Sequence, residues 1–381
     1  MPERTYFDYC ATTPVNPAVL ESMLPCLTEQ FGNPSSLHYR GRAADELLEK
    51  ARQQVANAIG ASPNEITFTS GATEANNLAL HGVLKPDGPE QNHLITSAIE
   101  HHAVLHTAEM LQSQGVDLTV LPVNQDGLVN PKDIQSALQS NTALISIMYV
   151  NNEIGSVQPI AEIASLAHEH DIIFHTDAVQ ALGMYSIDVH ALGIDLLSLS
   201  AHKIYGPKGS GALYVRDGLV LKPLIYGGPQ ERELRAGTEN LPGIVGLGTA
   251  IELVQNKRIE QSTRLRILRQ HFVNRLQSEI PGGVINGPRE HTAPHVISVS
   301  FPGSDAEMML FRLDQAGFAA SMGSACNAES IEPSHVLLAL GLEPDRIQGT
   351  LRFSLGYPTD EEDIEHLMSV LPGIVEECQV A

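Results

Sequence analysis

The sequence predicts an α/β protein with a large domain built on a mostly parallel seven-stranded sheet and a smaller α+β domain. Between residues 65 and 215, short runs rich in β-branched residues alternate with helical patterns, as in a doubly wound sheet. A long amphipathic stretch over residues 241–278 reads as one connecting helix. Beyond it, strand and helix patterns mix, which is typical of an α+β unit.

The elements of the large domain follow one another in a regular order. We expect strands over Ile66–Thr69, His93–Thr96, Leu118–Leu121, Ala143–Tyr149, Ile172–His175, Leu196–Leu199 and Gly211–Val215. We expect helices over Thr73–Val83, Ala103–Gln114 and Ile160–His170. The last of these helices follows Pro159, a residue that suits a helix start.

The small domain begins near residue 258, where the regular alternation of strand and helix patterns changes. In it we expect strands over His295–Ser300 and Thr350–Ser354, and helices over Asp305–Gln315 and Asp360–Glu377. The predicted division is a large domain of residues 15–258 and a small domain of residues 1–14 and 259–381.

Composition and charge exclude several classes of protein. The 381 residues include 23 Lys and Arg against 45 Asp and Glu, so the formal net charge is −22, which disfavours binding to nucleic acid or to anionic lipid. No apolar run is long enough to span a membrane, and the N-terminus lacks the pattern of a signal peptide. We therefore expect a cytoplasmic protein that binds neither nucleic acid nor membrane.

The first segment that could form a binding site is Ser70–Asn77, at a predicted junction of strand and helix. A helix N-terminus favours an anion, Gly71 permits close approach of the backbone, and Thr73 adds a hydroxyl, so a phosphate fits here. The alternative is an ordinary N-cap turn. Neither glycine-rich nucleotide motif is present in the segment.

Two further segments lie at the carboxyl ends of predicted strands. Lys203, beside His202 and before a glycine-rich turn, is a candidate for Schiff-base formation; the alternative is a solvated loop lysine, as we expect for Lys208. Asp177 is a candidate partner for the pyridinium nitrogen of pyridoxal phosphate; the alternative is a helix N-cap. A phosphate site, an acid and a lysine in this chain order indicate a pyridoxal-phosphate site more specifically than any one of them does.

The histidines and cysteines limit which metal sites and nucleophiles the chain can form. The run that contains His168, His170 and His175 straddles a predicted helix end and a strand, so we predict no intrinsic metal site. None of the four cysteines forms a C-x-x-C pair. Cys326 lies among small residues and is the candidate nucleophile, whereas Cys26 and Cys378 fit helix packing and Cys10 has no assigned role.

The chain resembles the cysteine desulfurases of the NifS/IscS type, within the fold type I, class V aminotransferase superfamily of pyridoxal-phosphate enzymes. The resemblance covers nearly the whole length. It is carried by residues 8–14, 31–35, 69–74, 100–101, 150–155, 202–209, 235–238, 323–326 and 352–356.

The resemblance implies a role for each matching residue. Lys203 would carry pyridoxal phosphate, Asp177 would pair with its ring nitrogen and Gln180 with its ring hydroxyl, and His101 would stack on the ring and handle protons. Asn152 would contact both cofactor and substrate. The implied phosphate ligands are Ala72, Thr73, Ser200 and His202, with Thr238 from a second subunit. The implied substrate ligands are Asn33, Asn152 and Arg352, the last as a bidentate carboxylate clamp.

The resemblance also implies the reaction and the partners. A homodimer would convert L-cysteine to L-alanine and leave the sulfur as a persulfide on Cys326, for a sulfur acceptor such as an iron–sulfur scaffold. Only through that persulfide would Cys326 meet an iron–sulfur cluster. The long segment around Cys326 resembles the group I arrangement. The chain stops at Ala381 without the longer tail of some members, from which we expect weak, salt-sensitive acceptor docking.

Three alternatives remain at this point. A selenocysteine lyase would use the same residues. A class V aminotransferase would need no nucleophilic Cys326. A non-catalytic sulfur carrier would need neither Lys203 nor Asp177 nor His101.

Overall fold

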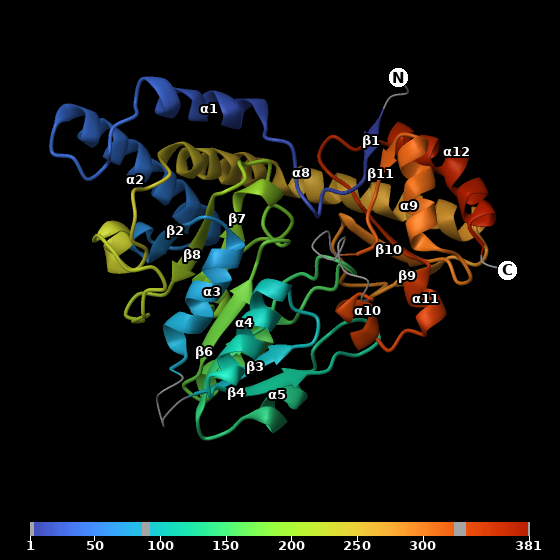
Figure 1. The fold of residues 1–381 in the computed structure, drawn as a ribbon, viewed down its shortest axis with the longest axis horizontal. Coiled ribbons are helices and arrows are strands. Elements are labelled where there is room, and N and C mark those ends of the chain that lie inside the picture. Colours follow the sequence, from blue (N-terminus) through green and yellow to red (C-terminus); the bar gives the residue numbers. More distant parts are fainter. Residues whose placement is uncertain (1–3, 86–91, 324–332, 380–381) are drawn as a thin grey trace.

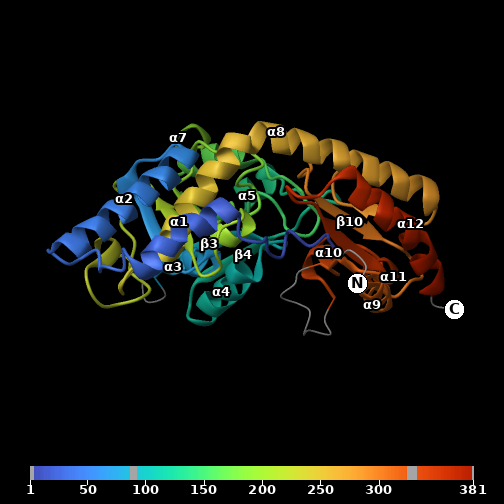
Figure 2. The same cartoon turned by 90° about the horizontal axis from the view of Figure 1, so that it is seen from above.

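The computed structural model describes residues 4–85, 92–323 and 333–379, and it forms two lobes joined by one long helix (Figures 1 and 2). The larger lobe holds a seven-stranded sheet in the order β2-β8-β7-β6-β5-β3-β4, and β8 alone runs in the direction opposite to the other six strands. Its strands are β2 (Ile66–Thr69), β3 (His93–Ser97), β4 (Asp117–Leu121), β5 (Thr142–Ser146), β6 (Ile173–Asp177), β7 (Leu196–Ser200) and β8 (Gly211–Val215). The seven predicted strands and their mostly parallel arrangement are confirmed.

One strand is shorter than predicted. The expected strand Ala143–Tyr149 is assigned only as far as Ser146. The chain beyond it stays bonded to β6, since the N–H of Ile147 donates to the His175 carbonyl and that of Tyr149 to the Asp177 carbonyl. The apolar run therefore continues alongside β6 beyond the end of β5, without regular strand geometry.

Side chains alternate between the two faces of this sheet, and each face has its own cover. On one face, Leu94 and Leu196 pack with α3 (Ala72–Val83) and α4 (His102–Ser113). On the other face, their neighbours Ile95 and Leu197 join the core that includes helices α2 (Tyr39–Ile59), α6 (Ile160–Glu169) and α8 (Leu241–Glu279). A sheet covered on both faces leaves its strand ends as the accessible place for a ligand.

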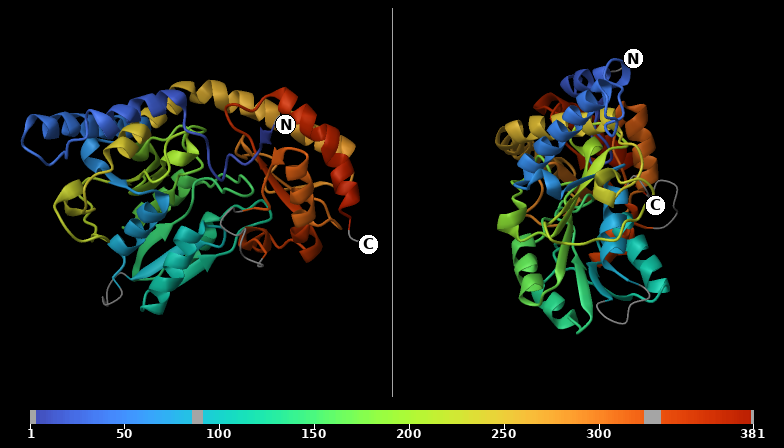
Figure 3. Two further views of the ribbon diagram at one scale, coloured as in Figure 1. Left: turned by 45° about the horizontal axis from the view of Figure 1, so that its top comes forward. Right: turned by 90° about the vertical axis from the view of Figure 1, so that its left-hand side faces the viewer.

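Shorter elements complete this lobe. They are α1 (Pro17–Thr28), α5 (Pro131–Ala137), α7 (Val189–Leu192) and the 3₁₀ turns η1 (Pro63–Glu65), η2 (Ala201–Lys203) and η3 (Gln230–Glu233). The N-terminal segment crosses from the small lobe to α1 (Figure 3). On the way, the Thr13 N–H donates to the carbonyl oxygen of His202, just after β7.

The small lobe is built on an antiparallel sheet in the order β12-β10-β9. Its elements are β9 (Val284–Asn286), β10 (Val296–Ser300), β12 (Thr350–Ser354), the parallel pair β1 (Thr5–Tyr6) and β11 (Phe318–Ala319), and helices α9 (Ala306–Gln315), α10 (His335–Ala339), α11 (Pro344–Gln348) and α12 (Glu361–Glu377). The predicted strands and helices of this part are all present. Helix α8 places Val254 in the core of the large lobe and Leu265 in that of the small lobe. Among the described helices, none is both long and apolar enough to cross a bilayer.

Candidate active site

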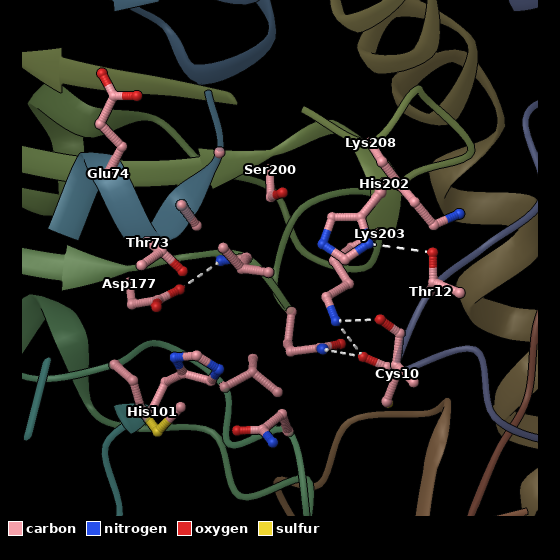
Figure 4. Close-up of a pocket in the computed structure, with 18 of the residues that line it drawn as sticks. Cys10, Thr12, Thr73, Glu74, His101, Asp177, Ser200, His202, Lys203 and Lys208 are labelled. Atoms are coloured by element: carbon pink, nitrogen blue, oxygen red, sulfur yellow. Dashed lines mark hydrogen bonds between the residues drawn. The ribbon is translucent and has the colours of Figure 1, made fainter. Parts of the chain in front are cut away.

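A cavity of about 420 Å³ lies at the carboxyl ends of the large sheet, where the N-terminal segment and the small lobe meet it (Figure 4). Most of the residues singled out in the sequence line it: Ala72, Thr73, His101, Asn152, Asp177, Gln180, Ser200, His202, Lys203 and Arg352. The structure therefore brings together side chains from both lobes at one place.

The start of α3 forms one wall of the cavity. Gly71 has φ +153°, which favours glycine, and it precedes the helix, whose first turn presents N–H groups that have no acceptor within the helix. The β8 backbone passes close by, because a Cβ at Gly211 would lie 2.7 Å from the Gly71 Cα. Glu74 holds the turn, accepting a 2.9 Å hydrogen bond from the Ser70 N–H and pairing with Arg235 at 2.8 Å. This wall suits an anion.

Asp177 lies at the end of β6 and is 6% exposed. Its Oδ2 accepts a 2.7 Å hydrogen bond from Asn76 Nδ2 on α3, and its Oδ1 accepts one of 3.0 Å from the Val179 N–H. Turns follow it, so Asp177 caps no α-helix, contrary to the alternative interpretation. Spacing alone does not identify Asn76 as the residue that orients this carboxylate, although it lies within the predicted Ser70–Asn77 segment.

Lys203 lies in η2, directly after β7, and its Nζ points into the cavity (Figure 4). Nζ donates 2.6 Å hydrogen bonds to the carbonyl oxygens of Cys10 and Ala11. The neighbouring His202 Nδ1 lies 3.2 Å from Thr12 Oγ1, and burial together with Lys203 and Lys208 lowers the pKa of His202 to about 4. Lys203 is thus held inside the site, whereas Lys208 is exposed at its rim.

The N-terminal segment also fixes Gln180. Its Nε2 donates to the Cys10 carbonyl at 3.1 Å, and its Oε1 lies 3.2 Å from His295 Nε2. Cys10 itself is 2% exposed, and burial is the main cause that raises the pKa of its thiol. Cys10 therefore lines the site as a buried residue.

His101 caps the N-terminus of α4, since its Nδ1 accepts a 3.0 Å hydrogen bond from the Ala103 N–H. Beneath it, Glu100 is fully buried and accepts hydrogen bonds at Oε1 from Ser97 Oγ at 2.5 Å and from the Met148 N–H at 3.0 Å. Burial raises the pKa of Glu100 to about 8. Glu100 thus ties the ends of β3 and β5 together beneath the cavity as a neutral acid.

Arg352 enters the site from β12 of the small lobe and is 1% exposed. Its Nη2 donates to Asp8 Oδ1 at 2.7 Å and its Nη1 to the Asn152 carbonyl at 3.1 Å. Its Nε has no hydrogen-bond partner within the described parts of the chain. Asp8 belongs to the N-terminal stretch that carries the resemblance, but its pairing with a residue 344 positions away leaves no signal in the sequence.

Two predicted site residues lie outside the cavity of this chain. Asn33, in the loop after α1, and Thr238, after η3, are both exposed and do not line it. Cys326 lies outside the described residues. Cys26 and Cys378 are buried in the two lobe cores, as predicted.

The histidines considered as metal ligands have other partners. His175 is buried between Ser146 Oγ at 2.8 Å and Ser198 Oγ at 3.0 Å, and burial lowers its pKa to about 3. His168 Nε2 lies 3.1 Å from Asp195 Oδ2. Within the described residues, no group of three or more His, Cys, Asp or Glu side chains could hold a metal ion.

Comparison with known proteins agrees with this geometry. The family described as Aminotransferase class-V matches residues 5–367. A protein of Dictyoglomus turgidum named cysteine desulfurase IscS is 48% identical over 379 residues, covering 100% of this chain and 96% of its own. Among solved structures, a NifS-like protein superposes with a TM-score of 0.92 at 37% identity, covering 98% of this chain and 100% of its own. SspA in complex with cysteine superposes with a TM-score of 0.82 at 43% identity, covering 92% and 98%.

These likenesses extend over both lobes and include the segments that build the cavity. The predicted fold type I architecture is confirmed by the NifS-like structure. The chain belongs to the class V aminotransferase family, in the group that contains the IscS-type and NifS-like proteins.

Proposed function

We propose that this protein is a pyridoxal-phosphate-dependent cysteine desulfurase, which converts L-cysteine to L-alanine and transfers the sulfur to Cys326. One observation carries the proposal: Lys203, Asp177 and the start of α3 surround a single cavity into which Arg352 reaches from the other lobe. The relatives named cysteine desulfurase, and the SspA structure with bound cysteine, support the same substrate.

The donor set of the cavity fits pyridoxal phosphate. The α3 N-terminus with Ala72 and Thr73, together with Ser200 and His202, would hold the phosphate. Asp177, oriented by Asn76, would pair with the ring nitrogen, and Gln180 would contact the ring hydroxyl. Lys203 would hold the cofactor covalently. When bound, the cofactor supplies an electron sink that stabilises a carbanion at the substrate Cα.

The chain's own residues then bind and orient L-cysteine. Arg352 would grip the substrate carboxylate, since its Nε is buried and has no other acceptor among the described residues. Asn152, and Asn33 of a second subunit, would complete the substrate contacts. Because His101 Nδ1 accepts the α4 cap hydrogen bond, its Nε2 is the ring atom that can carry a proton toward the cavity.

Sulfur transfer is a substitution at sulfur. The Cys326 thiolate forms an S–S bond with the substrate sulfur, and the bond from that sulfur to Cβ breaks. The electron pair of the broken bond passes to the carbon skeleton, which takes up a proton at Cβ and leaves as L-alanine. The persulfide on Cys326 then passes its outer sulfur to an acceptor protein, for which an iron–sulfur scaffold is our proposal.

We also propose a homodimer, in which Thr238 reaches the phosphate site of the other subunit. Large apolar side chains are exposed on α1, in the loop after it, which contains Asn33, and in the loop before η3. They are Leu20, Leu24, Leu27, Phe31, Leu37, Val220 and Tyr226, each at least half exposed in the single chain. Burying such a surface favours association.

The domain division and the location of the protein stay predictions. The separate cores on the two halves of α8 support a boundary near residue 258. A cytoplasmic location rests on the sequence alone.

The covalent lysine gives the proposal a direct test. The purified holoenzyme should absorb visible light, and borohydride reduction followed by peptide mapping should place the cofactor on Lys203. Adding L-cysteine should change the spectrum and release alanine. A label on Lys208, or a protein that takes up no pyridoxal phosphate, would contradict the assignment.

A further inference from the structure

Glu153 is a buried carboxylate between the two lobes that none of the steps above uses. It is 2% exposed, and its N–H donates a 2.9 Å hydrogen bond to Asn151 Oδ1 in the loop after β5. Its Oε1 has no hydrogen-bond partner within residues 4–85, 92–323 and 333–379. A buried polar atom without a hydrogen-bond partner costs free energy, which indicates that the Glu153 side chain has a use at this place.

The other oxygen, Oε2, contacts both described ends of the segment that contains Cys326. On the far side of the segment, Ser334 Oγ donates a 2.6 Å hydrogen bond to Oε2. On the near side, a Cβ at Gly323 would lie only 2.8 Å from the same oxygen, so the backbone of Gly323 passes directly against it. Gly323 has φ +136°, which favours glycine as well.

Both ends are also tied to residues of the active site. Before the segment, Ser321 and Arg352 exchange backbone hydrogen bonds of 3.1 and 2.6 Å. After it, His335 Nε2 lies 2.8 Å from the carbonyl oxygen of Glu100, the residue before His101. The two described ends of the segment are therefore fixed relative to Arg352 and to His101.

We propose that Glu153 is a positioning residue for Cys326. One oxygen of Glu153 accepts the Ser334 hydrogen bond and lies against Gly323, so it fixes the described residues on either side of Cys326, and this would set the approach of the thiol to the substrate sulfur. The inference rests on the proposed function, because it concerns the attack by Cys326. Glu153 does not line the cavity, so it acts through Cys326 and not on the substrate.

The test separates substrate binding from sulfur transfer in the holoenzyme. In Glu153→Ala, the absorbance change on adding L-cysteine should keep its wild-type half-saturation, because Arg352 and Lys203 are untouched. Single-turnover appearance of one extra sulfur atom on the Cys326 peptide, followed by mass spectrometry, should slow about 10²-fold, the scale expected when a reacting group is misplaced by about 1 Å. Glu153→Gln retains an acceptor for Ser334 and should stay within a few-fold of wild type.

Further variants test the same contact from its other side. Ser334→Ala should slow sulfur transfer, and its effect should not add to that of Glu153→Ala, since both remove one contact. Gly323→Ala should slow transfer too, because its Cβ would push Oε2 away. Glu162→Ala, an exposed carboxylate at the start of α6, is the matched control and should behave as wild type.

The outcomes keep the two proposals apart. Wild-type transfer rates in Glu153→Ala, or additive effects with Ser334→Ala, would overturn the positioning role. If Glu153→Ala fails to fold, Ser334→Ala and Gly323→Ala decide the matter by the same split between binding and transfer. Wild-type protein that binds L-cysteine but forms no alanine would instead contradict the proposed function, and the positioning role would fall with it.

Discussion

Arg352 of the small lobe lines the cavity and contacts Asn152 of the large lobe there. It is buried, it contacts Asp8 and the Asn152 carbonyl, and its Nε points to no acceptor among the described residues. A planar guanidinium can hold a carboxylate through two parallel hydrogen bonds, which an ammonium group cannot reproduce. In the proposed function, Arg352 would therefore combine substrate recognition with a contact between the small lobe and the large one.

Arg352→Lys should raise the KM for L-cysteine about ten- to a hundredfold, the loss expected for a charge-assisted hydrogen bond. Steady-state alanine formation measures this change. The spectrum of the holoenzyme without substrate should stay as in wild type. Arg289→Lys, at an exposed arginine, is the control. An unchanged KM in Arg352→Lys would remove this residue from the substrate site.

Glu100 makes stability depend on pH in a defined direction. Burial raises its folded-state pKa from 4.5 to about 8, so between these values the folded protein holds a proton that the unfolded chain has lost. Stability contributed by this site is therefore full below pH 4.5 and is lost as the pH rises to about 8.

Glu100→Gln should remove that loss, because the amide keeps an acceptor for Ser97 Oγ and the Met148 N–H without titrating. Thermal unfolding measured at several pH values is the readout. We expect a flatter dependence of the Tm on pH in Glu100→Gln than in wild type over this window. Parallel curves for the two proteins would show that Glu100 does not titrate as described.

At the residue scale, the sequence predicted residues that the structure places in the cavity, but not the residues that support them. Lys203 and Asp177 could be predicted because they combine a reactive side chain with a strand end. Asn76, Asp8 and Glu153 act through contacts between distant parts of the chain, and no local pattern reports such contacts. Their roles needed the three-dimensional structure.

At the scale of elements, one buried ion pair anchors the loop that carries Thr238. Arg52 on α2 donates to both carboxylate oxygens of Glu231 at 2.8 and 2.9 Å, and the Phe68 N–H also donates to Glu231. Glu231 and the next two residues all have positive φ, a conformation that costs free energy in residues other than glycine. The ion pair holds this turn against β2.

Arg52→Met should lower the free energy of unfolding by about 3–5 kcal/mol, because it leaves Glu231 buried without a counter-charge. Urea denaturation measures this loss. Lys50→Met, at an exposed lysine on the same helix, should change the free energy of unfolding by less than about 0.5 kcal/mol. A similarly small change in Arg52→Met would mean that the turn at Glu231 is held by other contacts.

The sequence predicted all seven strands of the large sheet and helix α8. It did not predict α2 (Tyr39–Ile59), although this helix has 21 residues. The pair β1 and β11 has two residues in each strand, and α10 and α11 have five residues each, too few to show a period. These short elements exist because distant segments meet, as when β1 pairs with β11.

At the scale of the whole molecule, a single chain leaves the proposed site incomplete. Asn33 and Thr238 lie outside its cavity, and the apolar surface of α1 is exposed, with Leu20 and Leu24 each 50% exposed and Leu27 60%. A second copy that covers this surface would supply both residues. The fold was predictable from one chain, whereas the proposed composite site would depend on assembly.

Leu24→Glu combined with Leu27→Glu should convert the proposed dimer to monomers, because two charges would be buried at the interface. Light scattering coupled to size-exclusion chromatography measures the mass. Ile267→Glu, at a residue of α8 that is 65% exposed, should leave the dimer intact. Monomeric wild-type protein, or a double variant that stays dimeric, would contradict this interface.

We propose that this molecule moves sulfur from L-cysteine to Cys326. The most direct measurement adds L-cysteine in slight excess to the holoenzyme without reductant, and then determines the alanine formed and the mass of each cysteine peptide. We predict one alanine per active site and one extra sulfur atom on the Cys326 peptide, with neither in Cys326→Ala. Full alanine formation in Cys326→Ala, or sulfur on Cys10 in place of Cys326, would contradict the account.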